Sequence, residues 1–337
     1  MLKCFLLSGE NTKLAAAELK SVLEAYSQII KLKREGRLVI VKTEISKEKM
    51  RRIQSRLALT RISGDLLFRC EVHELDSLLK KFDWARIYEQ SFAVRVLRIN
   101  GKNHKRELSE GKIGGLIFEF LKKSGLEPVV NLTNPETDIR IIVQDEKIFC
   151  VKVIAEREEG FEKRRQGKLP SRYPVGMHPK LSRCMVNLTG ASDSSRVYDP
   201  FCGTGGILIE AALIGMKAEG SDIDEDMLKL CAQNLKHLGI RAKIFRLDAT
   251  QISKPLEYVV SDLPYGKSSK LSEEKEKLYA KFIKVLELRL KGTAVLCINK
   301  KDYSMFRERL KRIKIEAVFD HYIHKSLTKR IMVLKAC

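Results

Sequence analysis

The stretch Asp199-Pro200-Phe201-Cys202-Gly203-Thr204-Gly205-Gly206 decides the fold of the C-terminal half of this chain, because it joins a predicted strand to a predicted helix. Its glycines remove side chains where the backbone must bend and approach a ligand. The helix that follows presents unpaired N–H groups and the positive end of its dipole. This turn, which we call the donor loop, therefore predicts a Rossmann-like α/β domain with a site for a nucleoside-type cofactor.

The sequence around the donor loop alternates between strands and helices from Arg196 onward, which predicts a mostly parallel sheet covered by helices. We expect strands near 196–199, 217–222, 242–247, 257–262 and 293–298, and helices near 205–215, 224–238, 275–290 and 301–312. The last two segments, Ile315–His324 and Thr328–Lys335, predict an antiparallel pair at the end of the sheet. Such an ending is unlike the usual dinucleotide-binding fold.

Acidic residues follow four successive predicted strands: Asp199, Asp222, Asp248 and Asp262. In open α/β sheets the carboxyl ends of the strands form the edge where ligands bind. Asp222, followed by Ile223, is placed to accept ribose hydroxyls. Asp248 can accept an adenine amino group while Ala249 donates its N–H to a ring nitrogen. The alternative is that each Asp only forms a turn or caps a helix.

A second turn, Asp262-Leu263-Pro264-Tyr265-Gly266, ends the fourth of these strands and is called the catalytic turn below. A carboxylate and a backbone carbonyl can each accept one N–H of a planar amine and aim its lone pair at a methyl donor. Pro264 stiffens the turn, and Tyr265 offers a face on which a base can stack. Asp262 is also placed to take up the released proton. The two turns together predict methyl transfer from S-adenosylmethionine (AdoMet) to an exocyclic base nitrogen, without a metal. The alternative is an ordinary surface turn.

Three further groups of residues give weaker signals. His178, Pro179 and Leu181 are predicted either to fold over the methionine end of AdoMet or simply to start a helix. His321 and His324 are expected on the surface, because this spacing in a strand points them to opposite faces. The eight cysteines have no C-x-x-C spacing, and we interpret them, including Cys202, as packing residues.

The balance of charge is strongly basic, with 64 Lys and Arg against 43 Asp and Glu in 337 residues. This excess favours a polyanionic partner such as nucleic acid. A heat-adapted protein with a charged surface would explain a large number of charged residues, but it would not explain the excess of positive over negative ones. Six residues are candidates for RNA contacts: Arg95, Lys102, Lys105, Arg106, Arg164 and Arg165. The alternative is a solvated basic loop.

With no signal peptide and no apolar run near the ~20 residues of a membrane span, we expect a cytoplasmic monomer.

The first 155 residues predict mixed α+β structure. We expect strands at 2–7, 38–41, 66–72, 91–99, 138–143 and 147–154, with helices at 12–26, 47–59 and 113–121. A segment with Pro, Gly and Arg-Arg and little periodicity follows. The predicted division is an N-terminal domain of residues 1–54, a second domain of residues 55–155, a linker of residues 156–174 and an α/β domain of residues 175–337.

The C-terminal half resembles class I AdoMet-dependent methyltransferases that methylate amino groups, on the donor loop and the catalytic turn. Phe92-Ala93-Val94-Arg95, Gly114-Gly115 and Val130-Asn131-Leu132-Thr133-Asn134-Pro135 make residues 55–155 similar to a THUMP RNA-binding domain. Residues 1–54 resemble the ferredoxin-like domain that accompanies THUMP. The whole chain resembles the archaeal tRNA guanine-10 N2-methyltransferases. That resemblance implies S-adenosylhomocysteine as the second product and a THUMP domain that grips the acceptor end of tRNA.

Other functions remain open at this point. Relatives that methylate guanine-6 of tRNA share the layout, often with Asn in place of the aspartate that stands here at position 262. A DNA amino-methyltransferase, a non-catalytic RNA-binding protein and a dehydrogenase are further alternatives. The basic first half argues against a DNA amino-methyltransferase. The two turns argue against a non-catalytic protein, and the antiparallel tail argues against a dehydrogenase. The number of methyl groups transferred depends on the space around the nitrogen.

Overall fold

The computed structural model describes residues 2–26, 31–100, 108–172, 176–264 and 269–337. Contacts divide the chain into two compact units. The first unit consists of Met1–Gly9, Gln28–Gln54 and Thr60–Arg157, and the second consists of Glu10–Ser27, Ser55–Leu59 and Glu158–Cys337. A helix from the start of the chain, α1 (Thr12–Tyr26), thus belongs to the second unit.

The first unit is built on a mixed sheet of seven strands within the described residues, in the order β2-β3-β1-β4-β7-β6-β5. The strands are β1 (Leu2–Leu7), β2 (Lys31–Glu35), β3 (Leu38–Lys42), β4 (Thr60–Glu71), β5 (Phe92–Asn100), β6 (Thr137–Gln144) and β7 (Lys147–Glu156). Its helices include α2 (Lys47–Arg56), whose last two residues belong to the second unit, α3 (Leu75–Lys81) and α4 (Glu110–Lys123). Among the described strands of this sheet, only β5 and β6 pair in parallel, and α4 lies between them in the sequence.

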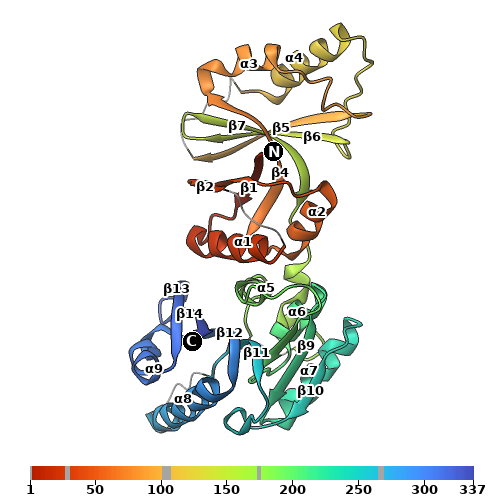
Figure 1. Cartoon of the computed structure of the whole chain (residues 1–337). Helices are drawn as coiled ribbons and strands as arrows, with labels where there is room; N and C mark the ends of the chain where they lie inside the picture. Colours follow the sequence, from red (N-terminus) through yellow and green to blue (C-terminus); the bar gives the residue numbers. More distant parts are fainter. Residues whose placement is uncertain (1, 27–30, 101–107, 173–175, 265–268) are drawn as a thin grey trace. The chain divides into compact units, whose positions relative to one another are not determined.

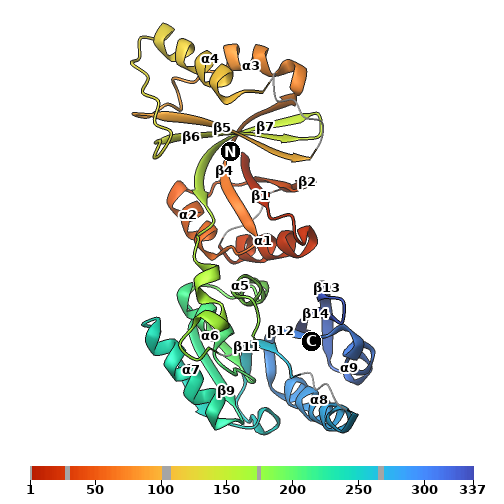
Figure 2. The ribbon, with the colours of Figure 1, turned by 180° about the vertical axis from the view of Figure 1, so that it is seen from behind.

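Helices α3 and α4 lie side by side over β5, β6 and β7 in both views (Figures 1 and 2). Helix α4 has apolar residues at helical spacing, and its buried Ile113, Ile117 and Leu121 pack against Ile139 and Ile141 of β6. Burial of such side chains contributes about 1.5–3 kcal/mol each. This contact gives the first unit a core of its own.

The second unit is built on a sheet in the order β10-β9-β8-β11-β12-β14-β13 (Figure 1). Its strands are β8 (Arg196–Asp199), β9 (Lys217–Asp222), β10 (Lys243–Arg246), β11 (Leu256–Asp262), β12 (Leu290–Asn299), β13 (Ile313–His324) and β14 (Leu327–Ala336). Its remaining α-helices are α5 (Pro179–Leu188), α6 (Gly206–Leu213), α7 (Glu225–His237), α8 (Ser269–Arg289) and α9 (Tyr303–Arg309). Strands β8 to β12 are parallel, whereas β14 is antiparallel to both β12 and β13. The predicted mostly parallel sheet with an antiparallel end is confirmed.

Helices α8 and α9 lie on the side of this unit that carries β13 and β14 (Figure 2). Tyr279 and Phe282 of α8 are fully buried and belong to one apolar cluster with Val259, Leu296 and Phe306. This cluster fixes β11 and β12 from one side of the sheet. It therefore holds the ends of these strands, where the predicted site lies.

Two elements, β2 and α3, escaped the sequence prediction. Strand β2 is an exposed edge strand of mainly charged residues, so it lacks the apolar alternation of a strand. Helix α3 has only seven residues. Helix α5 begins at the helix start that His178 and Pro179 predicted, and its polar residues Arg183 and Asn187 are buried together with its apolar ones. The predicted helix near 47–59 ends at Arg56, and the predicted linker contains two short 3₁₀ turns, Phe161–Arg164 and Gln166–Lys168.

Within the described part of the chain, no helix combines the length and the apolar character that crossing a lipid bilayer requires.

Candidate active site

The donor loop leads from the end of β8 into α6, and two of its positions require glycine. Gly203 has φ +49° and Gly205 has φ +86°, in the left-handed region that disfavours other residues. A Cβ atom on Gly205 would also lie 2.6 Å from Sγ of Cys231 on α7. The loop can therefore pass close beneath α7 and leave the N-terminus of α6 open.

Backbone contacts anchor the donor loop to β9. The N–H of Cys202 donates to the carbonyl of Ser221 over 2.9 Å. The N–H of Gly203 donates to Oδ2 of Asp222 over 2.8 Å. Asp222, the acid at the end of β9, thus holds the donor loop directly. The adjacent Ile223 has an exposed side chain.

Asp199 is the buried acid at the end of β8. Its Oδ1 accepts hydrogen bonds from the hydroxyl of Ser261 (2.6 Å) and the N–H of Phe201 (3.1 Å). Burial raises the pKa of this carboxyl group to about 7, and the nearby Asp222 and Asp262 act in the same direction. Such a group favours a cationic ligand beside it.

The predicted acids do lie at one edge of the sheet, because β8, β9, β10 and β11 are parallel. Asp199, Asp222 and Asp262 are the last residues of their strands. Asp248 differs, because β10 already ends at Arg246. Asp248 instead begins the 3₁₀ turn Ala249–Gln251 and accepts the N–H of Thr250 over 2.8 Å. Ala249 is buried.

A cavity of about 320 Å³ joins the donor loop to the catalytic turn. Nine predicted site residues line it: Asp199, Phe201, Cys202, Gly203, Thr204, Gly206, Asp262, Leu263 and Pro264. Five other residues complete the lining: Gln166, Gly176, Met177, Ile207 and Met227. The structure therefore brings the two turns together in one site. Among the predicted cofactor residues outside this lining, Asp222 contacts the site through Gly203.

The catalytic turn is held from two sides. The N–H of Leu263 donates to the carbonyl of Cys297 on β12 over 2.9 Å, and the Leu263 side chain is fully buried. The carbonyl of Pro264 accepts the hydroxyl of Tyr279 on α8 over 2.9 Å. Asp262 pairs with Lys329 of β14. The predicted stacking residue Tyr265 lies outside the described residues.

Gln166, in the segment before α5, joins the donor loop to α7. Its Oε1 accepts the Thr204 hydroxyl over 2.8 Å and Nδ2 of Asn234 over 3.3 Å. A Cβ atom on Gly206 would lie 2.9 Å from Nε2 of Gln166. The predicted linker thus supplies part of the wall of the cavity.

His178, Pro179 and Leu181 do not line this cavity, so the interpretation of these residues as a helix start is the one that the structure favours. Nδ1 of His178 accepts the N–H of Lys180 over 3.1 Å, which caps α5, and Pro179 takes the first turn. Nε2 of His178 contacts Oε1 of Glu162 at 3.0 Å. His178 and Leu181 line a neighbouring hollow of about 610 Å³ instead.

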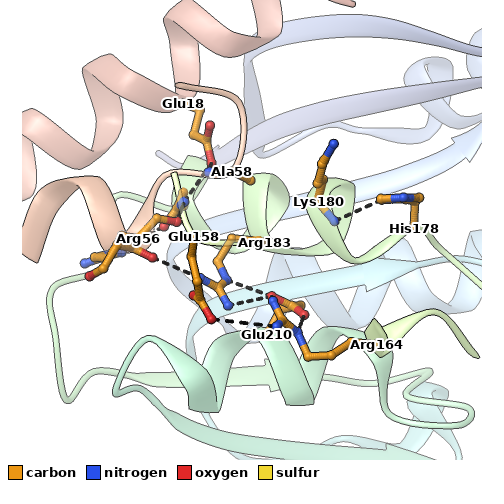
Figure 3. Close-up of polar contacts among 11 residues, drawn as sticks. Glu18, Arg56, Ala58, Glu158, Arg164, His178, Lys180, Arg183 and Glu210 are labelled. Carbon is orange, nitrogen blue, oxygen red and sulfur yellow. Dashed lines mark hydrogen bonds and ion pairs between the residues drawn. The ribbon is translucent and has the colours of Figure 1, made fainter. Parts of the chain in front are cut away.

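The side chain of Arg164 forms an ion pair within the second unit (Figure 3). Its Nε lies 2.7 Å from Oε1 of Glu210 on α6, and its side chain is 10% exposed. Arg183 of α5 approaches Oε2 of the same carboxylate at 2.7 Å. The interpretation of Arg164 as an RNA contact is therefore corrected, because a guanidinium buried against Glu210 is not available to a phosphate.

The other predicted RNA contacts differ in their surroundings. Arg95 pairs with Asp138 on the neighbouring strand over 3.2 Å. Arg165 is half exposed and pairs with Glu162 over 2.9 Å. Lys102, Lys105 and Arg106 lie outside the described residues. Arg165 is thus the accessible member of the Arg164–Arg165 pair.

The remaining side chains of the site do not suggest a nucleophile or a metal centre. A hydrogen bond to Cys231, together with burial, raises the pKa of the Cys202 thiol far above its ordinary value. A thiol in that state is not a nucleophile. Among the residues that the structure describes, no group of three or more His, Cys, Asp or Glu side chains is arranged to hold a metal ion.

Sequence reasoning missed Gln166, Met177, Met227 and Lys329. Each comes from a segment distant in sequence from both turns, and no motif marks them. The one available signal for Lys329 was the antiparallel tail itself. An antiparallel strand begins at the edge where its parallel neighbours end.

Comparison with known protein families gives two matches. Residues 166–331 match the family described as RMKL-like, methyltransferase domain. Residues 70–150 match the THUMP domain.

Three relatives that match over nearly their whole length are each named tRNA (guanine(10)-N2)-dimethyltransferase. The protein of Methanothermobacter thermautotrophicus is 34% identical over 336 residues, which cover 98% of either chain. That of Methanocaldococcus jannaschii is 31% identical over 98% of this chain and 99% of its own. That of Pyrococcus abyssi is 30% identical over 96% of either chain. A tRNA (guanine(6)-N2)-methyltransferase of Archaeoglobus fulgidus is 23% identical over 80% of this chain and 76% of its own.

Solved structures share the fold at lower identity. TrmN from Thermus thermophilus has a TM-score of 0.58 and 19% identity, with complete coverage of both chains. SMU.472 complexed with SAH has a TM-score of 0.55 and 15% identity, over 98% of this chain and 97% of its own. These likenesses concern the fold alone, and they agree with the predicted class I methyltransferase architecture.

Proposed function

The chain belongs to the family of the archaeal tRNA (guanine(10)-N2)-dimethyltransferases, and we propose that it methylates the exocyclic N2 of guanine-10 in tRNA with AdoMet as the donor. One observation carries this proposal. The donor loop and the catalytic turn line a single cavity at the carboxyl edge of the parallel strands. S-adenosylhomocysteine is the second product.

The residues of the donor site fit AdoMet. Gly203 and Gly205 keep side chains out of the space above α6, whose N-terminal N–H groups suit a carboxylate. Asp199 is placed for the cationic end of the ligand. Asp222 and Ile223 would hold the ribose, and Asp248 with Ala249 would hold the adenine. When bound, AdoMet supplies a methyl group that its sulfonium already activates.

Asp262 is the residue that we assign to the amine. We propose that its carboxylate accepts one N–H of the guanine amino group and that a backbone carbonyl of the turn accepts the other. Leu263 and Pro264 hold the geometry through Cys297 and Tyr279. Positioning and electrostatics then account for the acceleration. Tyr265 is proposed as the stacking face from its sequence position alone.

The RNA-binding role is proposed for the THUMP match of residues 70–150. We propose the domain division 1–54, 55–155, 156–174 and 175–337, and a cytoplasmic protein that acts as a monomer. Arg95, Lys102, Lys105, Arg106 and Arg165 remain the proposed RNA contacts.

A guanine within a duplex must be flipped out of the stack before it can reach Asp262. Guanine-10 is preferred to guanine-6 because the guanine-10 enzymes are 30–34% identical, against 23%.

The proposal is tested with labelled AdoMet offered together with unmodified tRNA or with duplex DNA. We expect label in tRNA only. Asp262→Ala should lower the rate by about 10²–10³-fold while tRNA binding persists. Asp226→Ala, which removes an exposed acid on α7, serves as the control. Methylation of the DNA, or wild-type turnover by Asp262→Ala, would refute the assignment.

A further inference from the structure

The antiparallel strand β14 brings a lysine to the carboxyl edge of the sheet. Lys329 lies near the start of β14 and pairs in register with Asn299, the last residue of β12. Since β14 runs against β12, its first residues lie where β11 and β12 end. The antiparallel tail, which sets this sheet apart from a dinucleotide-binding fold, thus places the Lys329 side chain beside the catalytic turn.

The lysine contacts the acid of that turn directly. Nζ of Lys329 lies 2.5 Å from Oδ2 of Asp262, and the two side chains are 6% and 21% exposed. A buried ammonium is costly unless it is paired with an anion. The contact therefore restrains both partners, and one face of the carboxylate is turned toward β14.

The other titratable groups around this pair do not replace the lysine. Cys297 of β12 faces Asp262, and burial first, then the charge of Asp262, raises the pKa of its thiol well above the ordinary value. Asp199 of β8 adds negative charge. His321 of β13, opposite Lys329, is a partly buried imidazole whose pKa burial lowers. Within the described residues, Lys329 is a cation in hydrogen-bond contact with Asp262.

We propose that Lys329 is a positioning residue for methyl transfer: it fixes Oδ2 of Asp262, so that the carboxylate is oriented to accept the N–H of the guanine amino group. This inference rests on the role proposed for Asp262. Without this contact the carboxylate would lose its fixed orientation, and so would the amine that it binds. The lysine touches the acid and need not touch the substrate.

The test compares Lys329→Met, which keeps the length of the side chain, with Lys329→Arg, which keeps the charge. The matched control is Lys335→Met, on the same strand, whose exposed lysine pairs with Glu316 over 3.4 Å. Single-turnover rates with unmodified tRNA are measured together with AdoMet affinity and thermal stability. Lys329→Met is also made in an Asp262→Ala background.

We expect Lys329→Met to lower the single-turnover rate on the order of 10²-fold, because a small misplacement of a catalytic group has such an effect. Its AdoMet affinity should stay at the wild-type value. Lys329→Arg, which still donates to the carboxylate, should keep most of the rate, and Lys335→Met should behave as wild type. In the Asp262→Ala background Lys329→Met should cause no further loss.

Two results separate this inference from the proposed function. A wild-type rate in Lys329→Met, beside an inactive Asp262→Ala, would overturn the role of Lys329 and leave that of Asp262. Wild-type turnover by Asp262→Ala would overturn the role of Asp262 itself. If Lys329→Met does not fold, Lys329→Arg decides, and a rate as low as that of Asp262→Ala in a folded Lys329→Arg would contradict the proposal.

Discussion

Arg183 of α5 and Glu210 of α6 form an ion pair of 2.7 Å in which both side chains are only 1% exposed. Glu210 lies about one turn beyond the start of α6, the helix that the donor loop enters. Arg164 contacts the other oxygen of the same carboxylate (Figure 3). The buried carboxylate therefore ties the donor helix to α5 and to the segment before it.

The first prediction concerns this pair. Arg183→Met should lower the free energy of unfolding by about 3–5 kcal/mol, because it leaves a buried carboxylate with only part of its compensation. AdoMet affinity should fall as well, since α6 loses one of its anchors. Lys229→Met, which breaks an exposed pair with Asp226, should change neither quantity. Urea denaturation and calorimetry measure both, and equal stabilities of the two variants would count against the role of Arg183.

The second prediction concerns pH. Burial raises the pKa of Asp199 to about 7 from an ordinary 3.8. Below pH 3.8 this carboxyl is protonated in the folded and the unfolded chain. As pH rises toward 7 only the folded chain keeps the proton, so the stability that Asp199 contributes is lost over this window. Asp199→Asn should remove that decline, which urea denaturation at several pH values would show.

The same acid should link AdoMet binding to pH. A cationic ligand beside Asp199 favours its ionised form, so affinity should rise as pH rises toward about 7 and level off above it, and binding below pH 7 should release a proton. Asn at position 199 can still accept from Ser261 and Phe201, but it carries no charge. Its affinity should be lower and its binding free of this pH dependence. Calorimetry in buffers of different ionisation enthalpy measures the proton, and equal pH dependence in both proteins would contradict this placement.

The third prediction concerns Gln166. Gln166→Ala leaves the Thr204 hydroxyl and one N–H of Asn234 without this acceptor, which should cost about 1–3 kcal/mol of stability. AdoMet affinity should fall because the donor loop loses a support. Gln251→Ala, which truncates an exposed glutamine, is the control. Unchanged affinity in Gln166→Ala would show that the donor loop holds its shape without this contact.

The fourth prediction separates backbone strain from steric conflict at the donor loop. Gly205→Ala and Gly239→Ala both put a side chain at positive φ, which costs roughly 1–2 kcal/mol. Only at position 205 does the new Cβ meet another atom closely, Sγ of Cys231 at 2.6 Å. Gly205→Ala should therefore be the more destabilised variant, and it should also bind AdoMet more weakly. Equal unfolding midpoints would mean that α7 can move aside at no cost.

The core of the fold could be predicted because its signals are local. The donor loop, the strands that end in acids and the antiparallel tail all have patterns within a few residues. Strand β2 could not be predicted, since its charged residues belong to an exposed edge. Of helix α5 the sequence marked only the start, at His178 and Pro179, and that start was one of two interpretations.

The site was predicted in part for the same reason. Residues within the two turns were found from their own sequence, whereas Gln166 and Lys329 act through contacts with distant segments. Arg164 shows the converse error. A sequence gives its charge, but only the packing against Glu210 shows that the charge is buried.

The most direct test of the account is to map the methyl group. Unmodified tRNA is incubated with the protein and AdoMet, digested, and analysed by mass spectrometry of the fragments. The account predicts N2-methylated guanosine at position 10, and a transcript with adenosine at that position should remain unmethylated. Methylation at guanine-6, or at any atom other than N2, would contradict it.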